Sequence, residues 1–186
     1  MSMTKKIFKK IINDITIIIS NSDDKNDTKH ASNVLKLVRK LKPSADYVLQ
    51  IAAYGHDIDR GLPHRKRFKD YNGDYDVYKK AHSIQGAKEI IKILKKYDIP
   101  QETIDKIKKL VEKHEFGGDK ESNILKDADS IALIKYDLAN YIKKHSKKES
   151  LSKINWMYKR MNSPKAKQIA KPFYNQAIKK LRIYES

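Results

Sequence analysis

The predicted fold depends on the stretch Ala52-Ala53-Tyr54-Gly55-His56-Asp57-Ile58-Asp59-Arg60-Gly61. Its first residues end an apolar helix predicted for residues 44–56, and its last residues open a polar, basic segment. His56 and Asp57 are adjacent at that boundary. A neutral imidazole and a carboxylate at the end of a buried helix can bind one metal ion together. Such a pair is more often explained by a histidine that interacts with the negative end of a helix dipole. The positions of the other histidines and aspartates decide between this explanation and a metal site.

Length and composition limit the classes of protein. A chain of 186 residues fits one domain with a proper core. It has no cysteine, which excludes disulfides, thiolate zinc sites and a cysteine nucleophile, so a metal site must use His, Asp or Glu. The apolar segment 11–19 is too short to span a membrane and carries Asn13 and Asp14, so we interpret it as a core helix. We expect a cytoplasmic protein without a membrane partner.

The formal net charge of +18 at pH 7 allows two interpretations. A nucleic acid or nucleotide partner would explain it. The alternative is a compositional bias of the genome combined with solvated helix faces. Lysine far outnumbers arginine and is spread along the chain, whereas arginine is the better phosphate ligand. The charge alone does not decide between them.

Apolar residues recur at helical spacing along most of the chain, and no stretch alternates as a strand does. This pattern predicts an all-α, single-domain helical bundle of about seven or eight helices. Asp27 or Thr28 is expected to cap the second helix, and Pro43 to start the third. Residues 58–77 are expected to form a long loop, and residues 143–150 a charged break. The predicted helices are residues 4–20, 28–41, 44–56, 77–97, 101–114, 121–144, 151–161 and 164–183.

Five potential metal ligands lie on the inward faces of five different predicted helices. An isolated inward histidine is more often a hydrogen-bonded core residue. Several in one domain, together with carboxylates, favour a metal, because burying so many titratable groups without a partner costs free energy. Helical bundles build metal sites from the side chains of facing helices in this way. The five residues are His30, His56, His82, His114 and Asp129.

Two aspartates compete for the last ligand position. Asp127 and Asp129 are two residues apart, so on a helix they point roughly 200° from each other. Asp129 shares the apolar stripe of Ala132 and Leu133. We therefore expect Asp129 to face the site and Asp127 to cap or support a neighbouring segment.

The order His30, His56-Asp57 and Asp129 resembles the H…HD…D pattern of the HD-domain superfamily of metal-dependent phosphohydrolases, which have an all-α fold. The resemblance covers about residues 28–140, with residues 4–20 and 151–183 packed on this core. It implies that His30, His56, Asp57 and Asp129 bind a divalent metal ion.

Two features qualify the resemblance. A basic residue often follows the last aspartate in the superfamily, whereas Ser130 follows it here. Residues 154–177 are similar to an uncharacterised family related to HD domains, which says nothing about substrate.

The resemblance also gives His82 and His114 a role. In two-metal members of the superfamily, extra histidines hold a second ion and the HD aspartate bridges the pair. His82 and His114 are similar in order and placement, although they could instead contact a substrate phosphate or orient water. We expect one or two ions per chain, and ligands without sulfur suit Mn, Fe, Co, Ni, Mg or Zn.

The resemblance implies hydrolysis of a phosphate ester, with a nucleotide or a related phosphorylated small molecule as the expected substrate, by a metal-activated water. Asp57 would then act in catalysis by binding the metal. Asp59 is a candidate for the base or for a residue that orients the water, and the alternative is that it only caps a turn. The basic segment after Asp57 is a candidate for substrate binding, or else a solvated loop. Its candidate residues are Arg60, His64, Arg65 and Arg67, with Lys66 between them.

Two other functions remain open at this stage. HD-type di-iron oxygenases share the six-ligand pattern, and oxygen consumption with two bound irons would identify one. A non-catalytic nucleic-acid or nucleotide-binding module would show binding that weakens steeply with salt. The sequence decides neither the substrate nor the metal nor the oligomeric state.

Overall fold

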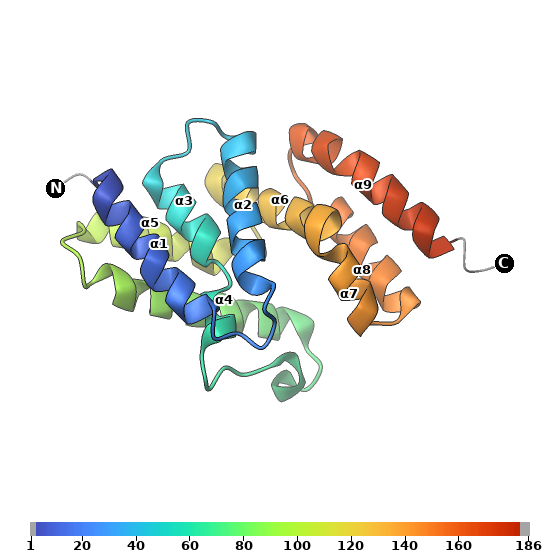
Figure 1. Cartoon of the computed structure of the whole chain (residues 1–186), viewed down its shortest axis with the longest axis horizontal. Coiled ribbons are helices and arrows are strands. Elements are labelled where there is room, and N and C mark those ends of the chain that lie inside the picture. The colour runs from blue at the N-terminus through green and yellow to red at the C-terminus, as the bar shows by residue number, and fades with distance from the viewer. Residues whose placement is uncertain (1–2, 183–186) are drawn as a thin grey trace.

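Helices make up the regular structure of residues 3–182, the part of the chain that the computed structural model describes, and no strand occurs in that range (Figure 1). Helices α6 and α7 continue each other through a π-helical turn, Leu133–Asp137. Counting them as one helix gives eight, so the all-α prediction is confirmed. The helices are α1 Lys5–Ile19, α2 Asp27–Leu41, α3 Tyr47–Gly55, α4 Tyr75–Leu94, α5 Gln101–Lys113, α6 Lys120–Ala132, α7 Leu138–Lys144, α8 Lys147–Lys159 and α9 Pro164–Arg182.

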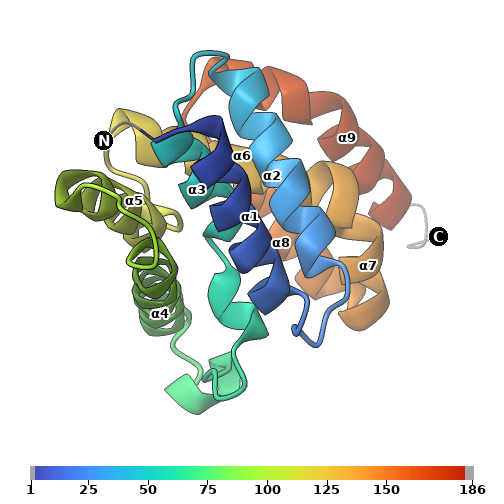
Figure 2. The same ribbon diagram turned by 60° about the vertical axis from the view of Figure 1, so that its left-hand side comes forward.

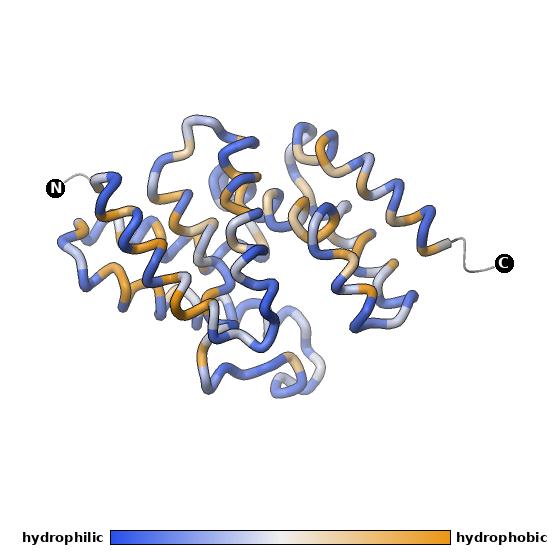
Figure 3. Tube along the Cα trace, in the orientation of Figure 1, coloured by the Kyte–Doolittle hydropathy of each residue, from blue (hydrophilic) through white to orange (hydrophobic). Residues whose placement is uncertain are grey.

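Helix α6 lies in the middle of the described molecule. Helices α2 and α5 pack on one side of it and α8 and α9 on the other, while α1 and α3 pack against each other (Figures 1 and 2). Hydrophobic and hydrophilic positions alternate with the helical period along each helix (Figure 3). The apolar stripes meet in one core whose fully buried residues include Ile15, Leu49, Ile107, Ile131 and Ile154. Within residues 3–182, no helix is both long enough and apolar enough to cross a membrane.

Capping side chains move two helix starts away from their predicted positions. Helix α3 begins at Tyr47 and not after Pro43, because the carboxylate of Asp46 accepts a hydrogen bond from the backbone N–H of Leu49. Helix α8 begins at Lys147, so the predicted break at 143–150 is only two residues long. There Ser146 and Glu149 form a reciprocal capping box, which starts the helix despite the surrounding lysines.

The cap expected for α2 is also wrong. Asn26 occupies the N-cap position without a side-chain hydrogen bond to the helix. The carboxylate of Asp27 instead accepts hydrogen bonds from Ser22 and from Arg60. Asp27 therefore ties the start of α2 to the segment that follows His56 and Asp57.

The connection predicted for residues 58–77 ends at Asp74, because the carboxylate of Asp74 caps α4 and the helix begins at Tyr75. It contains two short 3₁₀ helices, Ile58–Gly61 and Phe68–Tyr71. The first is buried and holds the chain against α1. A Cβ atom built on Gly61 would lie 1.9 Å from the carbonyl oxygen of Ile18, so only glycine fits this contact between two backbones.

We expect Gly61→Ala to lower the free energy of unfolding by about 3 kcal/mol, at the upper end for an overpacked site, because the obstacle is backbone and cannot rotate away. Urea unfolding followed by circular dichroism measures this change. Gln85→Ala, on the exposed side of α4, is the control and should leave the stability within about 0.5 kcal/mol. Equal stability of the two variants would contradict this close packing.

Candidate metal centre

The helices bring four histidines and two aspartates together at one end of the core. His30 lies in the first turn of α2, while His56 and His114 are the C-cap residues of α3 and α5. His82 comes from α4 and Asp129 from α6. All of them are at least nine-tenths buried. The sequence predicted that the four histidines and Asp129 face inward from five different helices, and all five side chains are buried.

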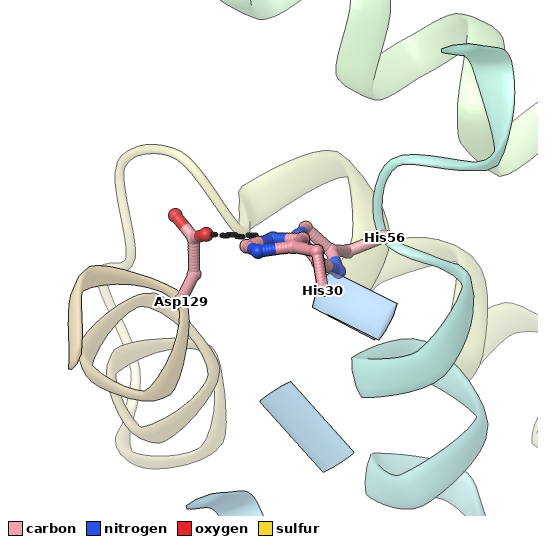
Figure 4. Close-up of side chains that lie close together, drawn as sticks. All are labelled: His30, His56 and Asp129. Carbon is pink, nitrogen blue, oxygen red and sulfur yellow. Dashed lines mark hydrogen bonds and ion pairs between the residues drawn. The ribbon is translucent and has the colours of Figure 1, made fainter. Parts of the chain in front are cut away.

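The first cluster consists of His30, His56 and Asp129 (Figure 4). The Nε2 atoms of the two imidazoles lie 3.3 Å apart. Oδ1 of Asp129 lies 3.2 Å from Nε2 of His30 and 3.8 Å from Nε2 of His56. Three donor atoms at these separations can surround one metal ion.

The second cluster consists of Asp57, His82 and His114. Oδ1 of Asp57 lies 3.6 Å from Nε2 of His114. The other carboxylate oxygen, Oδ2, faces the first cluster, 3.5 Å from Nε2 of His56 and 4.0 Å from Nε2 of His30. Asp57 therefore presents one oxygen to each cluster.

A second group near each imidazole fixes its orientation. Nδ1 of His56 and of His114 lies 3.0 and 2.7 Å from the carbonyl oxygens of Ala53 and Val111, which only accept hydrogen bonds. Both imidazoles therefore carry their proton on Nδ1 when neutral, and the lone pair of Nε2 points into the clusters. Such outer partners are usual for histidines that bind metals.

Carboxylates orient the other two imidazoles. Nδ1 of His30 lies 2.7 Å from Oδ2 of Asp137, the last residue of the π-helical turn. Nδ1 of His82 lies 3.5 Å from Oδ1 of Asp59 and 3.8 Å from Oδ1 of Asp57, while its Nε2 lies 3.4 Å from Oε1 of Glu115. Nε2 is therefore the atom of His30 left for a ligand, whereas His82 presents one nitrogen to Asp57 and the other to Glu115.

The donor atoms fit a metal. Nε2 of His114 is completely buried and has no hydrogen-bond partner among the described residues, which is costly unless something binds to it. Imidazole nitrogens and carboxylate oxygens suit Mn, Fe, Co, Ni or Zn, with Mg favoured less by the nitrogens. The two buried clusters can hold metal ions, and their donor atoms leave the choice of metal open.

Two arginines hold the carboxylates of the centre in their ionised form. Burial opposes the charge of Asp57, but Arg60 lies 2.7 Å away and keeps the pKa of this carboxyl well below its usual range. A hydrogen bond from His30 and the charge of Arg160 have the same effect on the pKa of Asp129. Charged carboxylates are the form that a metal ion binds.

The imidazoles differ in their protonation. Burial disfavours the charged form of His30 and of His82, but neighbouring carboxylates outweigh burial and raise the pKa of each to about 10. Burial, together with the charges of His56 and His82, lowers the pKa of His114 to about 4. Without metal at pH 7, His30 and His82 are therefore protonated and His114 is neutral.

We expect metal binding to release protons. A histidine must be neutral to bind a metal, and His30 and His82 carry a proton at any pH below about 10. Metal affinity should therefore rise with pH between 6.5 and 8.5. Calorimetric titration with Mn²⁺ in buffers of different ionisation enthalpy counts the released protons. Binding without proton release, and with no dependence on pH, would contradict these protonation states.

A cavity of about 290 Å³ opens onto the centre. His30, Asp57, His82 and Asp129 contribute to its wall, and Tyr75, Tyr78, Met157 and Lys153 line it farther out. A small molecule can therefore reach the side chains of both clusters from solvent.

The structure separates the residues of the predicted substrate-binding loop. Arg60 lines the cavity and also contacts Asp57 and Asp27. Arg65 and Arg67 line a second cavity, to which Arg60 also contributes, and Arg67 pairs with Asp23 at 2.7 Å. His64 is exposed and lines neither cavity.

The two aspartates with secondary roles occupy defined positions. Asp59 is 2 % exposed and lies beside His82, outside the cavity wall, so its position suits orienting that imidazole better than acting as a base. Asp127 faces away from the clusters, as expected. Its carboxylate accepts hydrogen bonds from the backbone N–H groups of Asn162 and Ser163, just before α9.

Besides Asp137, three residues near the centre were missed by the sequence prediction. Arg160, the C-cap residue of α8, contacts both Asp129 and Glu115. Lys153 extends from α8 into the cavity. Glu115 directly follows His114, and this adjacency is the one signal in the sequence that could have identified any of the three. The centre therefore includes residues from outside the predicted core of 28–140.

Comparison with known proteins gives one result for this chain. A family model described as "Domain of unknown function (DUF4202)" matches residues 12–181. No curated protein and no solved structure matched. The matched region contains both clusters, the cavity wall and Arg160, so the centre described above lies entirely inside it. The chain belongs to the family described as a domain of unknown function, DUF4202.

Proposed function

We propose that this protein is a metal-dependent phosphohydrolase of the HD-domain type, acting on a small phosphorylated molecule such as a nucleotide. The observation that carries the proposal is the position of Asp57, with one carboxylate oxygen facing each of two histidine clusters. Two ions held side by side can stabilise both the attacking and the leaving oxygen of a phosphoryl transfer and lower the pKa of a bound water. The order of the ligands, His30, His56-Asp57 and Asp129, also agrees with that superfamily.

The chain itself supplies positive charge for a phosphoryl group. The guanidinium of Arg60 is half-exposed and lies in the cavity wall, where one of its nitrogens contacts Asp57. It can therefore hold a phosphoryl oxygen while it keeps Asp57 in place. Tyr75 and Tyr78 form part of the same wall, and their rings suit an organic group such as a base or a sugar.

Lys153 is the cation best placed to bind the anionic group of a substrate. Its ammonium donates a hydrogen bond to the hydroxyl of Tyr75, 3.0 Å away, and no carboxylate in the described chain lies within 4 Å of it. Arg60 and Arg160, in contrast, are already paired with carboxylates. Lys153 thus has charge to offer a ligand.

We expect Lys153→Met to raise KM for the phosphorylated substrate by roughly tenfold, because one hydrogen bond to a charged group is lost. The metal content should not change, since Lys153 lies beyond the ligands. Steady-state kinetics and elemental analysis measure both quantities. Lys148→Met, at an exposed position of the same helix, is the control. An unchanged KM in Lys153→Met would show that the substrate does not use this cation.

A screen of phosphate esters tests the proposed function directly. Purified protein is incubated with nucleotides and sugar phosphates in the presence of Mn²⁺, Co²⁺, Ni²⁺ or Mg²⁺, and release of inorganic phosphate is measured. We expect release that stops with EDTA and in the His56→Ala, Asp57→Ala double variant. Full turnover and full metal content in that double variant would reject the proposal.

A di-iron oxygenase is the second candidate, because two clusters that share Asp57 suit a pair of irons equally well. Two bound irons, oxygen consumption and no phosphate release in the same screen would favour it. The net charge of +18 keeps nucleic acid as a proposed partner, and a steep loss of binding with salt would support that proposal.

A further inference from the structure

Glu115 lies beside the second cluster, and its carboxylate is not part of either group of three potential ligands. It follows His114 at the end of α5, and its side chain is 14 % exposed. Oε1 of Glu115 lies 3.4 Å from Nε2 of His82 and 3.9 Å from Nε2 of His114. Nε2 of His114 is the nitrogen that its hydrogen bond to the Val111 carbonyl leaves available, and Nε2 of His82 is the nitrogen turned away from Asp59. A donor oxygen therefore faces the same point as the two imidazoles.

The other oxygen of Glu115 is held by an arginine. Oε2 accepts a hydrogen bond from Nη1 of Arg160 at 2.7 Å. Arg160 also donates from Nε to the hydroxyl of Ser130, which fixes the plane of its guanidinium. The carboxylate of Glu115 therefore has a defined orientation, with Oε1 turned towards the histidines.

Asp129 repeats this arrangement at the first cluster. Its Oδ1 faces the Nε2 atoms of His30 and His56, and its Oδ2 lies 2.5 Å from Nη2 of Arg160. One guanidinium thus holds one oxygen of each carboxylate and leaves the other oxygen of each free for its own cluster. Such a fork of donors is a property of arginine that lysine lacks.

Three largely buried carboxylates, Asp57, Glu115 and Asp129, meet around the four imidazoles. Oε1 of Glu115 and Oδ1 of Asp129 contact no arginine in the described chain, because Arg160 holds the other oxygen of each carboxylate. Each of these two oxygens therefore keeps a lone pair that a divalent ion can bind.

We infer that Glu115 is the terminal carboxylate ligand of the second cluster, and that Arg160 positions it together with Asp129. Each cluster then has two imidazole nitrogens, one oxygen of Asp57 and one oxygen of its own terminal carboxylate. A set of two nitrogens and two oxygens suits Mn, Fe, Co or Zn. The inference rests on the proposed function only in requiring divalent ions at this centre, and it holds for either reaction proposed above.

Counting bound ions tests the inference without any activity assay. Metal-free protein is dialysed against graded concentrations of Mn²⁺, and bound Mn²⁺ is measured by elemental analysis. We expect two ions per wild-type chain. In Glu115→Gln we expect one ion to bind as before and the second to bind more than ~100-fold more weakly, beyond the ~10–100-fold loss that removal of an outer partner of a ligand causes. Glu115→Ala should weaken the second ion further.

Glu112→Gln is the matched control, because Glu112 is on the same helix and its nearest cation is Lys108, 3.8 Å away. It should bind two ions as the wild type does. Electron paramagnetic resonance gives a second readout: a coupled Mn²⁺ pair in the wild type and in Glu112→Gln, and an isolated ion in Glu115→Gln.

Three outcomes separate the possibilities. Two ions of unchanged affinity in both Glu115 variants would overturn the inference, even if the variants were less stable, because Glu115 would then serve only as a partner of Arg160. A wild type without bound Mn²⁺ would overturn it as well. Loss of one ion in Glu115→Gln supports it, and does so even if the wild type hydrolyses no phosphate ester, a result that would reject only the proposed function.

Discussion

We expect the Asp57→Asn variant to lose metal from both clusters at once and to lose turnover with it. Asp57 places one oxygen at each cluster, so a neutral amide weakens both sites, whereas replacement of any single histidine removes a ligand from one. Several kcal/mol of transition-state stabilisation come from bound metal, and each ~1.4 kcal/mol is a factor of ten in rate. Turnover should therefore fall by roughly 10³-fold or more.

The fold should survive this substitution. Asparagine has nearly the same shape, and Arg60 keeps its contact with Asp27 at 3.0 Å. Circular dichroism checks the fold, elemental analysis counts the ions, and phosphate release measures turnover. Asp98→Asn, on the exposed connection between α4 and α5, is the control and should behave as the wild type. Full metal content in Asp57→Asn would contradict the shared position of this carboxylate.

The second large effect is expected from Arg160→Met. Removal of this guanidinium leaves Glu115 and Asp129 buried without their cation, and breaking such a buried pair costs about 3–5 kcal/mol of stability. It also frees both carboxylates to rotate, so metal affinity at both clusters should fall by roughly 10–100-fold. Because bound metal neutralises the two carboxylates, Mn²⁺ should recover part of the lost stability.

Two further variants test whether Arg160 positions the two carboxylates for metal binding or only supports the fold. Arg160→Lys should restore little metal affinity, because one ammonium cannot hold two carboxylates as a planar fork does. Lys159→Met, at the exposed neighbouring position, is the control. Urea unfolding with and without Mn²⁺, together with metal titration, measures both effects. A destabilised Arg160→Met protein with unchanged metal affinity would show that Arg160 only supports the fold.

The positions of the helices could be predicted because their signal is local. Apolar residues such as Ile11 and Ile15 in α1, or Ile104 and Ile107 in α5, recur at helical spacing and are buried. The exact starts of α3 and α8 could not be placed, because a single capping side chain moved each of them by three or four residues.

The four histidines and Asp129 of the clusters were predicted for a similar reason. Each lies on an apolar stripe, so its inward direction follows from the helical period. Asp57 was instead identified by its adjacency to His56 and by the order of the ligands along the chain. Asp137 could not be assigned in this way, because the π-helical turn changes the direction of its side chain relative to a regular helix.

Contacts between distant segments were not predictable from spacing. Arg160 is 31 residues from Asp129 and lies on a helix that the HD resemblance treated as an addition to the core.

The loop after Asp57 shows the opposite case, in which residues close in the sequence lie apart in the structure. Its basic composition predicted a common role for Arg60 and Arg67, but the chain turns after Gly61, so Arg60 faces the centre and Arg67 pairs with Asp23. The direction of a loop depends on packing that composition does not describe.

The number of metal ions per chain tests the central claim most directly. Protein is stripped of metal with a chelator, dialysed against Mn²⁺ at pH 8, and analysed for bound metal and for thermal stability. The arrangement of the two clusters predicts two ions per chain and a midpoint of unfolding that rises when they bind. No bound ion above trace, with the same unfolding midpoint in the presence of Mn²⁺ and of EDTA, would contradict the metal centre and every function proposed for it.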